Sequence, residues 1–179
     1  KAGLNVGIAG NIGKSFALQV AQSDFDYYVL EISSFQLDNI QDFAPHITLI
    51  TNITPDHLDR YNYSLNKYKD AKLRITKNQT ARDFFLFNAD DSILKEAIQN
   101  QQIVAKKIPF GFNNITEGTT HKNDQIIIKQ QNKNTMIQSA QFSLSGRHNL
   151  LNAMAAATIG SLLDISKESI RESLAHFKG

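Results

Sequence analysis

Short apolar segments alternate with helical patterns through the first hundred residues, and this alternation constrains the fold more than any other feature of the sequence. The apolar segments end in glycine or polar residues and have the length of buried strands: Leu4–Ala9, Tyr27–Ile32, Ile47–Asn52 and Asp83–Asn88. Helical patterns follow them at Lys14–Gln22, Phe35–Ile40 and Ser92–Asn100. Another helix is expected in the stretch that ends at Ile75, where it carries Tyr68, Lys72 and Arg74. Strands and helices that alternate in this way predict an α/β fold, with a mainly parallel, Rossmann-like sheet flanked by helices.

The pattern changes after Gln102, where strand candidates follow one another without a helix between them. Polar turns separate these candidates, which lie at Ile103–Phe110, Gln125–Lys129, Thr135–Gln138 and Gln141–Leu144. Consecutive strands joined by short turns favour antiparallel pairing, so we expect a small antiparallel subsheet. The chain then continues with an alanine-rich helix, a helix capped by Ser166 and a C-cap glycine: His148–Leu163, Lys167–Phe177 and Gly179.

The bulk composition excludes several classes of protein. The chain has 179 residues, the size of one domain, and its net charge is only +2, with scattered Lys and Arg. That charge gives no reason to expect nucleic acid or an acidic membrane as a partner. The absence of cysteine excludes disulfides and thiolate metal sites. No apolar run approaches the roughly 20 residues of a membrane span. Because Lys1 stands just before a strand-like segment, we expect an excerpt from a longer protein.

Polar side chains follow two of the expected strands at their carboxyl ends, where open α/β sheets bind ligands. Glu31 lies at the end of the second strand, and Asp56 and His57 belong to a turn after the third. A carboxylate in the position of Glu31 suits Mg²⁺, and together with His57 it predicts a shared metal site. The alternatives are that Glu31 is a capping or solvated acid, that His57 is structural, and that Asp56 only caps its turn.

Lys72 lies on an expected helix, with Tyr68 four residues before it and Ile75 three residues after it. These neighbours share its face and make that face partly apolar, so Lys72 is predicted to be half buried. A buried lysine is unfavourable unless it is paired or modified. The alternative is an exposed amine on a solvated helix face.

The loop after the first strand carries a weak phosphate-binding signal. Its two glycines let a ligand approach the backbone closely, and Asn11 between them offers both a donor and an acceptor. The run Gly13-Lys14-Ser15 looks like the end of a P-loop, but Ile8 stands where that motif needs glycine. A plain strand-to-helix turn is therefore the simpler interpretation.

Two amides stand near the start of the alanine-rich helix. Asn149 and Asn152 are three residues apart and so share a helix face, where they could contact the edge of a nucleotide base. The alternative is that Asn149 only caps the helix.

Taken together, these segments resemble the Mur ligases, a family of ATP-dependent enzymes that form amide bonds in peptidoglycan synthesis. The motifs that carry the resemblance span nearly the whole chain in the expected order: Gly10–Gly13, Leu30–Leu37, Asn52–Arg60, Tyr68 with Ala71–Ile75, Asn88–Asp91, and Leu144–Asn149 with Asn152 and Ala153. The Gly-Asn-Ile-Gly loop and the Ser-Ser-Phe-Gln-Leu run are similar to those of the family member that adds D-glutamate.

The resemblance implies a reaction, its partners and its site. The reaction is ATP-dependent addition of D-glutamate to UDP-N-acetylmuramoyl-L-alanine through an acyl phosphate, by a monomer in the bacterial cytoplasm. Asn11 and Ser33 would contact the UDP-muramoyl substrate, and Asn149 and Asn152 would approach the adenine of ATP. Three residues would be catalytic and would hold two Mg²⁺ ions: Glu31, His57 and Lys72. One of the two ions would be bound through a carbamate that CO₂ forms on Lys72.

One departure from the family pattern is expected to matter. The family's central domain opens with a strand and a Gly-rich loop that cradles the ATP phosphates, and this sequence lacks that segment. It also lacks the N-terminal UDP-binding domain and the C-terminal domain. Residues 1–179 are therefore expected to be a central ATP-binding domain without its P-loop, inactive alone. Because the C-terminal domain mostly selects the amino acid, the alternatives are another Mur-type or folylpolyglutamate-type ligase, or a non-catalytic nucleotide-binding module.

Overall fold

The computed structural model describes residues 2–113, 115–130, 133–140, 142–143 and 146–178. The strands are β1 (Val6–Gly10), β2 (Tyr27–Glu31), β3 (Ile47–Ile50), β4 (Phe84–Asn88), β5 (Lys106–Gly111), β6 (Gly118–Lys122), β7 (Gln125–Gln130) and β8 (Lys133–Gln138). The α-helices are α1 (Phe16–Gln22), α2 (Leu65–Leu73), α3 (Ser92–Gln99), α4 (Arg147–Leu162) and α5 (Lys167–His176). Short 3-10 helices lie between them: η1 (Ser34–Leu37), η2 (Leu58–Tyr61) and η3 (Arg74–Thr76). Within these described residues, no helix has the length and apolarity that crossing a membrane requires.

The larger sheet has six strands in the described part of the chain, in the order β3-β4-β5-β6-β7-β8. Neighbouring strands from β3 to β6 are parallel, whereas β7 is antiparallel to both β6 and β8. The predicted fold class is therefore confirmed: a mainly parallel sheet flanked by helices, with an antiparallel part. The antiparallel strands continue the main sheet and do not form a separate one.

Some details of the strand prediction are wrong. The segment Ile103–Phe110, expected in the antiparallel group, contains most of β5, which pairs parallel with β4. β6 has the sequence GTTHK, whose lack of an apolar pattern explains why the sequence does not predict it. In the expected strand Gln141–Leu144, Phe142 and Ser143 lie in no strand, and positions 141 and 144 are outside the described residues. The expected C-cap glycine at position 179 is outside them too.

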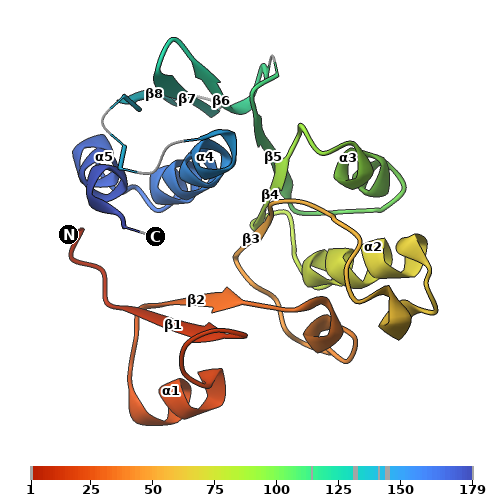
Figure 1. Ribbon diagram of the computed structural model, residues 1–179. Helices are drawn as coiled ribbons and strands as arrows, with labels where there is room; N and C mark the ends of the chain where they lie inside the picture. Colours follow the sequence, from red (N-terminus) through yellow and green to blue (C-terminus); the bar gives the residue numbers. More distant parts are fainter. Residues whose placement is uncertain (1, 114, 131–132, 141, 144–145, 179) are drawn as a thin grey trace.

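The strand β4 is buried on both faces, and it divides the core in two. Successive side chains of a strand point to opposite faces of the sheet. Accordingly, Phe85 packs with apolar residues of α2 and α3, whereas Leu86 packs with apolar residues of α4 and α5. Figure 1 shows these two pairs of helices on opposite sides of the central strands. Because helices cover both faces, the strand ends and their loops are left to carry the polar groups.

The strands β1 and β2 form a separate, parallel, two-stranded sheet beside the larger one (Figure 1). Its apolar side chains are open to solvent: Ile8 and Val29 are each 59% exposed. The other large exposed apolar side chains of this segment are Leu4, Val6, Ile12, Phe16, Leu18, Val20 and Tyr27. Neither core cluster includes a residue from before Ile47. The β1-α1-β2 segment therefore presents an apolar surface that the described residues do not cover.

Polar side chains fix the ends of several helices. Ser166 caps α5, as predicted, and Asp91 is the member of the Asn88–Asp91 run that caps α3. The helix α2 ends at Leu73, so Arg74 lies in η3 and not in the helix. The Arg74 guanidinium donates to the carbonyls of Leu37 and Asp38, which ties the end of α2 to the loop after β2.

A carboxylate anchors the starts of β3 and β4. Asp83 accepts hydrogen bonds from the N–H and the hydroxyl of Thr80, at 2.7 and 2.9 Å, and lies 2.9 Å from His46 Nδ1. The Thr80 N–H, followed by His46, holds the pKa of Asp83 below its ordinary value. The folded carboxyl therefore ionises at a lower pH than the unfolded one. Its stabilisation is present above the ordinary carboxyl pKa and is lost as the pH falls through the lowered value.

We expect Asp83→Asn to lower the melting temperature at neutral pH, and the difference from wild type to shrink below about pH 4. One lost hydrogen bond removes about 1 kcal/mol, which shifts the midpoint by roughly 2–4 °C in a chain of this size. Thermal melts followed by circular dichroism across that pH range measure both effects. Wild-type and variant curves that stay parallel into the acid range would contradict this role of Asp83.

Candidate functional site

The loop after β1 lies directly against the end of β2. Gly10 is paired with Glu31 in the sheet and has a φ of 111°, and a Cβ there would come within 2.1 Å of the Glu31 carbonyl oxygen. Only glycine fits such a close approach. The Asn11 N–H donates to the same carbonyl at 2.7 Å, and its side-chain Nδ2 donates to Glu31 Oε1 at 3.2 Å. The structure thus brings two of the predicted site residues, both solvent-exposed, into direct contact.

Ser33 follows β2 at the same strand end. It is the N-cap of η1, and its N–H donates to the side chain of Gln36 at 2.8 Å. Ser33 therefore lies two residues beyond Glu31 in a fixed turn. Its contact with a substrate stays a prediction.

The turn after β3 presents Asp56 and His57 to solvent. Asp56 Oδ1 accepts the His57 N–H at 2.9 Å, and Oδ2 lies 3.6 Å from His57 Nε2. This bond joins adjacent residues and does not cap η2, whose N-cap is His57. The Asp56 side chain is 67% exposed, and that of His57 is 72% exposed. His57 has a left-handed backbone with a φ of 48°, a conformation that non-glycine residues rarely adopt outside turns and functional sites. An exposed imidazole on a constrained backbone is suited to meet a ligand.

The loops after β2 and β3 are in contact with one another. The Arg60 guanidinium of η2 lies 4.7 Å above the centroid of the Phe35 ring of η1. This stacking keeps the segment that follows Glu31 beside the segment that follows His57. The two strand ends therefore contribute to one region of the molecule.

Lys72 faces this region from α2. As predicted, it is half buried, and its Nζ lies 5.2 Å from the centroid of the Tyr68 ring. Burial lowers the pKa of Lys72, and the negative charge of Asp56 opposes that shift. Burial raises the pKa of Tyr68, and Asp56 raises it further. The charge of Asp56 therefore acts on the helix face that carries both side chains. The helix α2 also packs against η1 and η2, which follow the two strand ends.

The donor atoms of this region fit Mg²⁺. Among the described residues, no three His, Cys, Asp or Glu side chains converge as metal ligands. Mg²⁺ does not need such a cage, because it commonly takes one or two carboxylates together with phosphate oxygens and waters. The exposed carboxylate of Glu31 suits that mode of binding, and a carbamate on Lys72 would add another oxygen donor. The predicted metal set of Glu31, His57 and Lys72 stays a prediction.

The start of α4 carries the two predicted base-contacting amides. Its N-cap is Gly146, so Asn149 lies inside the first turn and does not cap the helix, which removes that alternative. Asn152 is exposed and Asn149 is partly exposed on the same face. Their contact with adenine stays a prediction that this arrangement permits.

Sequence reasoning assigns no role to one largely buried carboxylate beside the start of α4, Asp90. Its side chain is 10% exposed and bonds to Arg147, with 2.9 Å between Oδ2 and the guanidinium. Arg147 in turn stacks over Phe112, with 4.1 Å between the guanidinium carbon and the ring centroid. In the sequence Asp90 is one of two adjacent acids in the Asn88–Asp91 run, and nothing there distinguishes it from Asp91, which caps α3.

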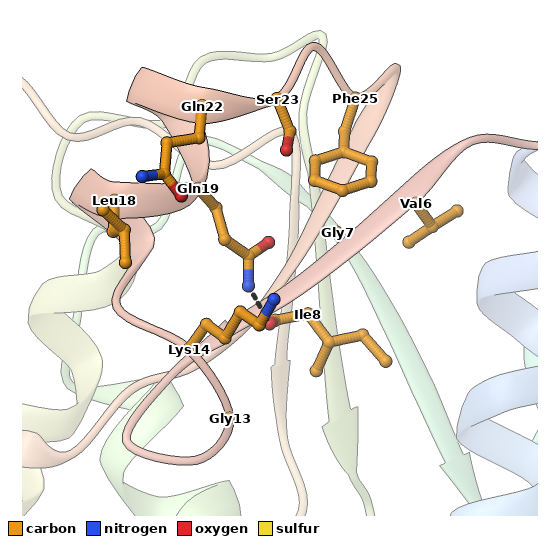
Figure 2. A pocket seen from close by; sticks show the side chains of 10 residues that line it. All are labelled: Val6, Gly7, Ile8, Gly13, Lys14, Leu18, Gln19, Gln22, Ser23 and Phe25. Atoms are coloured by element: carbon orange, nitrogen blue, oxygen red, sulfur yellow. Dashed lines mark hydrogen bonds between the residues drawn. The ribbon is translucent and has the colours of Figure 1, made fainter.

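The loop with the weak phosphate-binding signal leads into an apolar cavity of about 390 Å³ between β1 and α1 (Figure 2). Gln19 lies within it and donates to the Ile8 carbonyl at 2.5 Å, and Lys14 lies at its edge. Neither Asn11 nor Glu31 lines this cavity. The arrangement is that of a strand-to-helix turn, which is the simpler of the two interpretations of the sequence.

The fold and these loops define a class of protein: an open α/β domain whose polar groups gather beyond the carboxyl ends of parallel strands. Residues 6–160 match the family described as the Mur ligase middle domain. The chain therefore belongs to the Mur ligase family.

Two relatives by sequence share one name. The chain is 44% identical over 180 residues to the UDP-N-acetylmuramoylalanine--D-glutamate ligase of Christiangramia forsetii, and 46% identical over 178 residues to that of Bacteroides fragilis. The alignments cover 100% and 99% of this chain, but only 40% of each relative. The chain thus spans about 40% of the length of the curated relatives it matches.

Solved structures agree on the fold. A UDP-N-acetylmuramoyl-L-alanyl-D-glutamate--2,6-diaminopimelate ligase has a TM-score of 0.67 at 18% identity, covering 98% of this chain and 41% of that one. The UDP-N-acetylmuramate:L-alanyl-gamma-D-glutamyl-meso-diaminopimelate ligase of Neisseria meningitides has a TM-score of 0.68 at 17% identity, covering 99% and 59%. At these identities the likeness shows the fold alone.

We expect Lys72 to titrate below an ordinary lysine, and Asp56→Asn to lower its pKa further, because the variant removes a negative charge that favours the ammonium form. The same variant should bring the pKa of Tyr68 back toward its ordinary value. NMR titration of carbon-13-labelled lysine and tyrosine side chains measures both changes. Asp59→Asn is the matched control, since Asp59 lies near the same turn and causes neither shift. Equal titration of Lys72 in the two variants would contradict the assignment.

Proposed function

We propose that this chain is the central part of an ATP-dependent ligase that adds D-glutamate to UDP-N-acetylmuramoyl-L-alanine in the bacterial cytoplasm. The observation that carries the proposal is a half-buried lysine, Lys72, on the helix face influenced by the Asp56 charge. The family match and the names of the relatives support the choice of substrates.

The proposed roles follow the predicted site residues. Asn11 and Ser33 contact the UDP-muramoyl substrate, and Asn149 and Asn152 approach the adenine of ATP. The residues proposed to hold two Mg²⁺ ions are Glu31, His57 and carbamylated Lys72. The hydrogen bond from Asn11 to Glu31 supports this division, because it orients the carboxylate beside the substrate loop.

The reaction first brings together two anions, the carboxylate of the UDP-muramoyl substrate and the γ-phosphate of ATP, and then forms the amide. A carboxylate oxygen of the UDP-muramoyl substrate attacks the γ-phosphorus of ATP, ADP leaves, and an acyl phosphate results. The amine of D-glutamate then attacks the acyl carbon, and the tetrahedral intermediate loses phosphate to give the amide. Bound Mg²⁺ supplies charge neutralisation, so the protein's task is mainly to position the groups. Exposed side chains on a fixed backbone, such as His57 in its turn and Glu31 at the end of β2, suit that task.

Lys72 is suited to carbamate formation because its surroundings disfavour the ammonium form. The neutral amine attacks CO₂, a nitrogen–carbon bond forms and a proton leaves. The side chain then carries a negative charge and offers an oxygen donor. Burial against Tyr68 favours the neutral amine that this step needs.

We further propose that residues 1–179 correspond to the central ATP-binding domain downstream of its phosphate-binding loop. The other parts of the enzyme, including a UDP-binding domain and a C-terminal domain, would belong to a longer protein. The coverage of 40% of each relative supports this. So does the uncovered apolar surface of the β1-α1-β2 segment, which further chain would bury.

The reaction is tested with a full-length enzyme that carries this sequence. Supplied with ATP, Mg²⁺ and UDP-N-acetylmuramoyl-L-alanine, it should release phosphate with D-glutamate and not with L-glutamate, L-lysine or diaminopimelate. A colorimetric phosphate assay measures the release. Release with a different amino acid would keep the ligase chemistry and overturn the substrate. No release with any of them would favour a non-catalytic nucleotide-binding module.

In the same enzyme, Lys72→Ala should lower kcat by about 100-fold or more, because it removes a group that helps to neutralise transition-state charge. A small carboxylic acid at high concentration should restore part of the activity by replacing the carbamate oxygens. Lys67→Ala is the matched control, since Lys67 is an exposed lysine of the same helix. Wild-type activity in Lys72→Ala would remove the carbamate from the mechanism.

A further inference from the structure

One carboxylate bonds to two segments that are distant from it in the sequence. Asp90 follows β4, and its Oδ2 accepts the Phe112 N–H at 3.0 Å and the Arg147 guanidinium at 2.9 Å. Its Oδ1 accepts the side-chain amide of Asn113 at 2.6 Å and the Asn113 N–H at 3.4 Å. Each oxygen therefore accepts two hydrogen bonds, from the loop after β5 and, at Oδ2, also from the start of α4.

Asp90 itself is held in place. Its N–H donates to Oδ1 of the buried Asn88 at 2.9 Å, which fixes the turn after β4. On the facing strand, a Cβ at Gly111 would lie 2.8 Å from Asp90 Oδ1. The glycine thus leaves the space that the carboxylate occupies. Because its backbone is anchored and its surroundings are filled, Asp90 has a fixed position and holds the groups that bond to it in place.

The start of α4 is held in place through Asp90. A capping side chain normally fixes the start of a helix, but Gly146 at the N-cap of α4 has none. The first helical residue, Arg147, is instead held between the Asp90 carboxylate and the Phe112 ring. A planar guanidinium is suited to both contacts at once. A carboxylate from another strand end therefore holds the first residue of α4, whose following turns pack in the core.

The neighbouring acid, Asp91, bonds to two further segments. Asp91 Oδ1 caps α3 at the Leu94 N–H, and Oδ2 accepts the Ile53 N–H at 3.0 Å. Ile53 lies on the segment that leads from β3 to the Asp56 turn. Two adjacent carboxylates thus hold two different parts of the site, Asp91 the segment before His57 and Asp90 the start of α4.

We propose that Asp90 is a positioning residue for nucleotide binding, which acts through Arg147 on the first turn of α4. The proposal rests on the proposed function, in which Asn149 and Asn152 on that turn and the next contact adenine. Asp90 does not itself touch the nucleotide. Its removal should weaken ATP binding and leave binding of the UDP-muramoyl substrate and the chemical step intact.

The test is steady-state kinetics of the full-length enzyme with Asp90→Asn, in which an amide faces the Arg147 guanidinium. We expect the KM for ATP to rise about tenfold, the effect of losing one charged hydrogen bond. We expect kcat and the KM for the UDP-muramoyl substrate to change by less than about twofold, because their contacts lie elsewhere. Glu96→Gln is the control for a purely structural effect, since it breaks the Lys69–Glu96 ion pair on α2 and α3 and should lower stability only.

A double-mutant cycle shows whether Asp90 acts through Arg147. If it does, Arg147→Met should raise the KM for ATP by a similar factor, and the double variant should be no worse than either single one. Additive effects of the two substitutions on the KM for ATP would contradict the proposal that Asp90 acts through Arg147. A fall in melting temperature with an unchanged KM for ATP, or an equal loss in every kinetic parameter, would show a structural role only and overturn the proposal.

Failure of the proposed function is distinguishable from failure of this inference. If the wild-type enzyme releases no phosphate with any amino acid, ATP binding is measured directly by isothermal titration calorimetry. An increase of about tenfold in Kd for ATP in Asp90→Asn would then support the positioning role without the ligase reaction. An unchanged Kd, or no ATP binding by the wild type, would overturn it.

Discussion

Parallel pairing of strands decides which loops of this molecule meet. The register places Gly10 opposite Glu31 and Asn88 opposite Phe110, so the residues just beyond each pair come into contact. The bonds from Asn11 to Glu31, and from the loop after β5 to Asp90, are direct consequences of that register. Parallel pairing in both sheets therefore brings these loops together, and the helices α2 and α4 on the two faces of the larger sheet carry Lys72 and Arg147.

Electrostatics at Lys72 is a balance between burial and one nearby charge. Burial disfavours the ammonium form, and Asp56 favours it. Burial has the larger effect, because the Asp56 side chain is 67% exposed and its charge is screened by water. The amine is therefore neutral more often than that of a surface lysine.

Local pattern predicts most elements of this fold, because β1 to β4 are short apolar runs closed by glycine or polar residues, and because α3 and α5 follow capping residues. It fails at β6, whose Thr-Thr-His core has no such pattern and which is held by its neighbours β5 and β7. At the site, residues at strand ends and the half-buried Lys72 can be predicted from spacing. Asp90 cannot, because its partners lie 22 to 57 residues away and only the folded sheet brings them together. The roles of Asn149 and Asn152 came from the family resemblance and not from spacing alone.

The separation of the β1-α1-β2 segment from both core clusters has a consequence for folding and local opening. The clusters are built from residues between Ile47 and Leu174, so the six-stranded sheet and its helices hold most of the apolar contacts that resist unfolding. Residues 6 to 31 share in few of them, and their amides are expected to exchange with solvent through a local opening of low free energy. The carboxylate of Glu31 belongs to this weakly held unit, whereas Lys72 belongs to the stable one. Opening of the β1-α1-β2 segment would therefore separate Glu31 from the part of the molecule that carries Lys72.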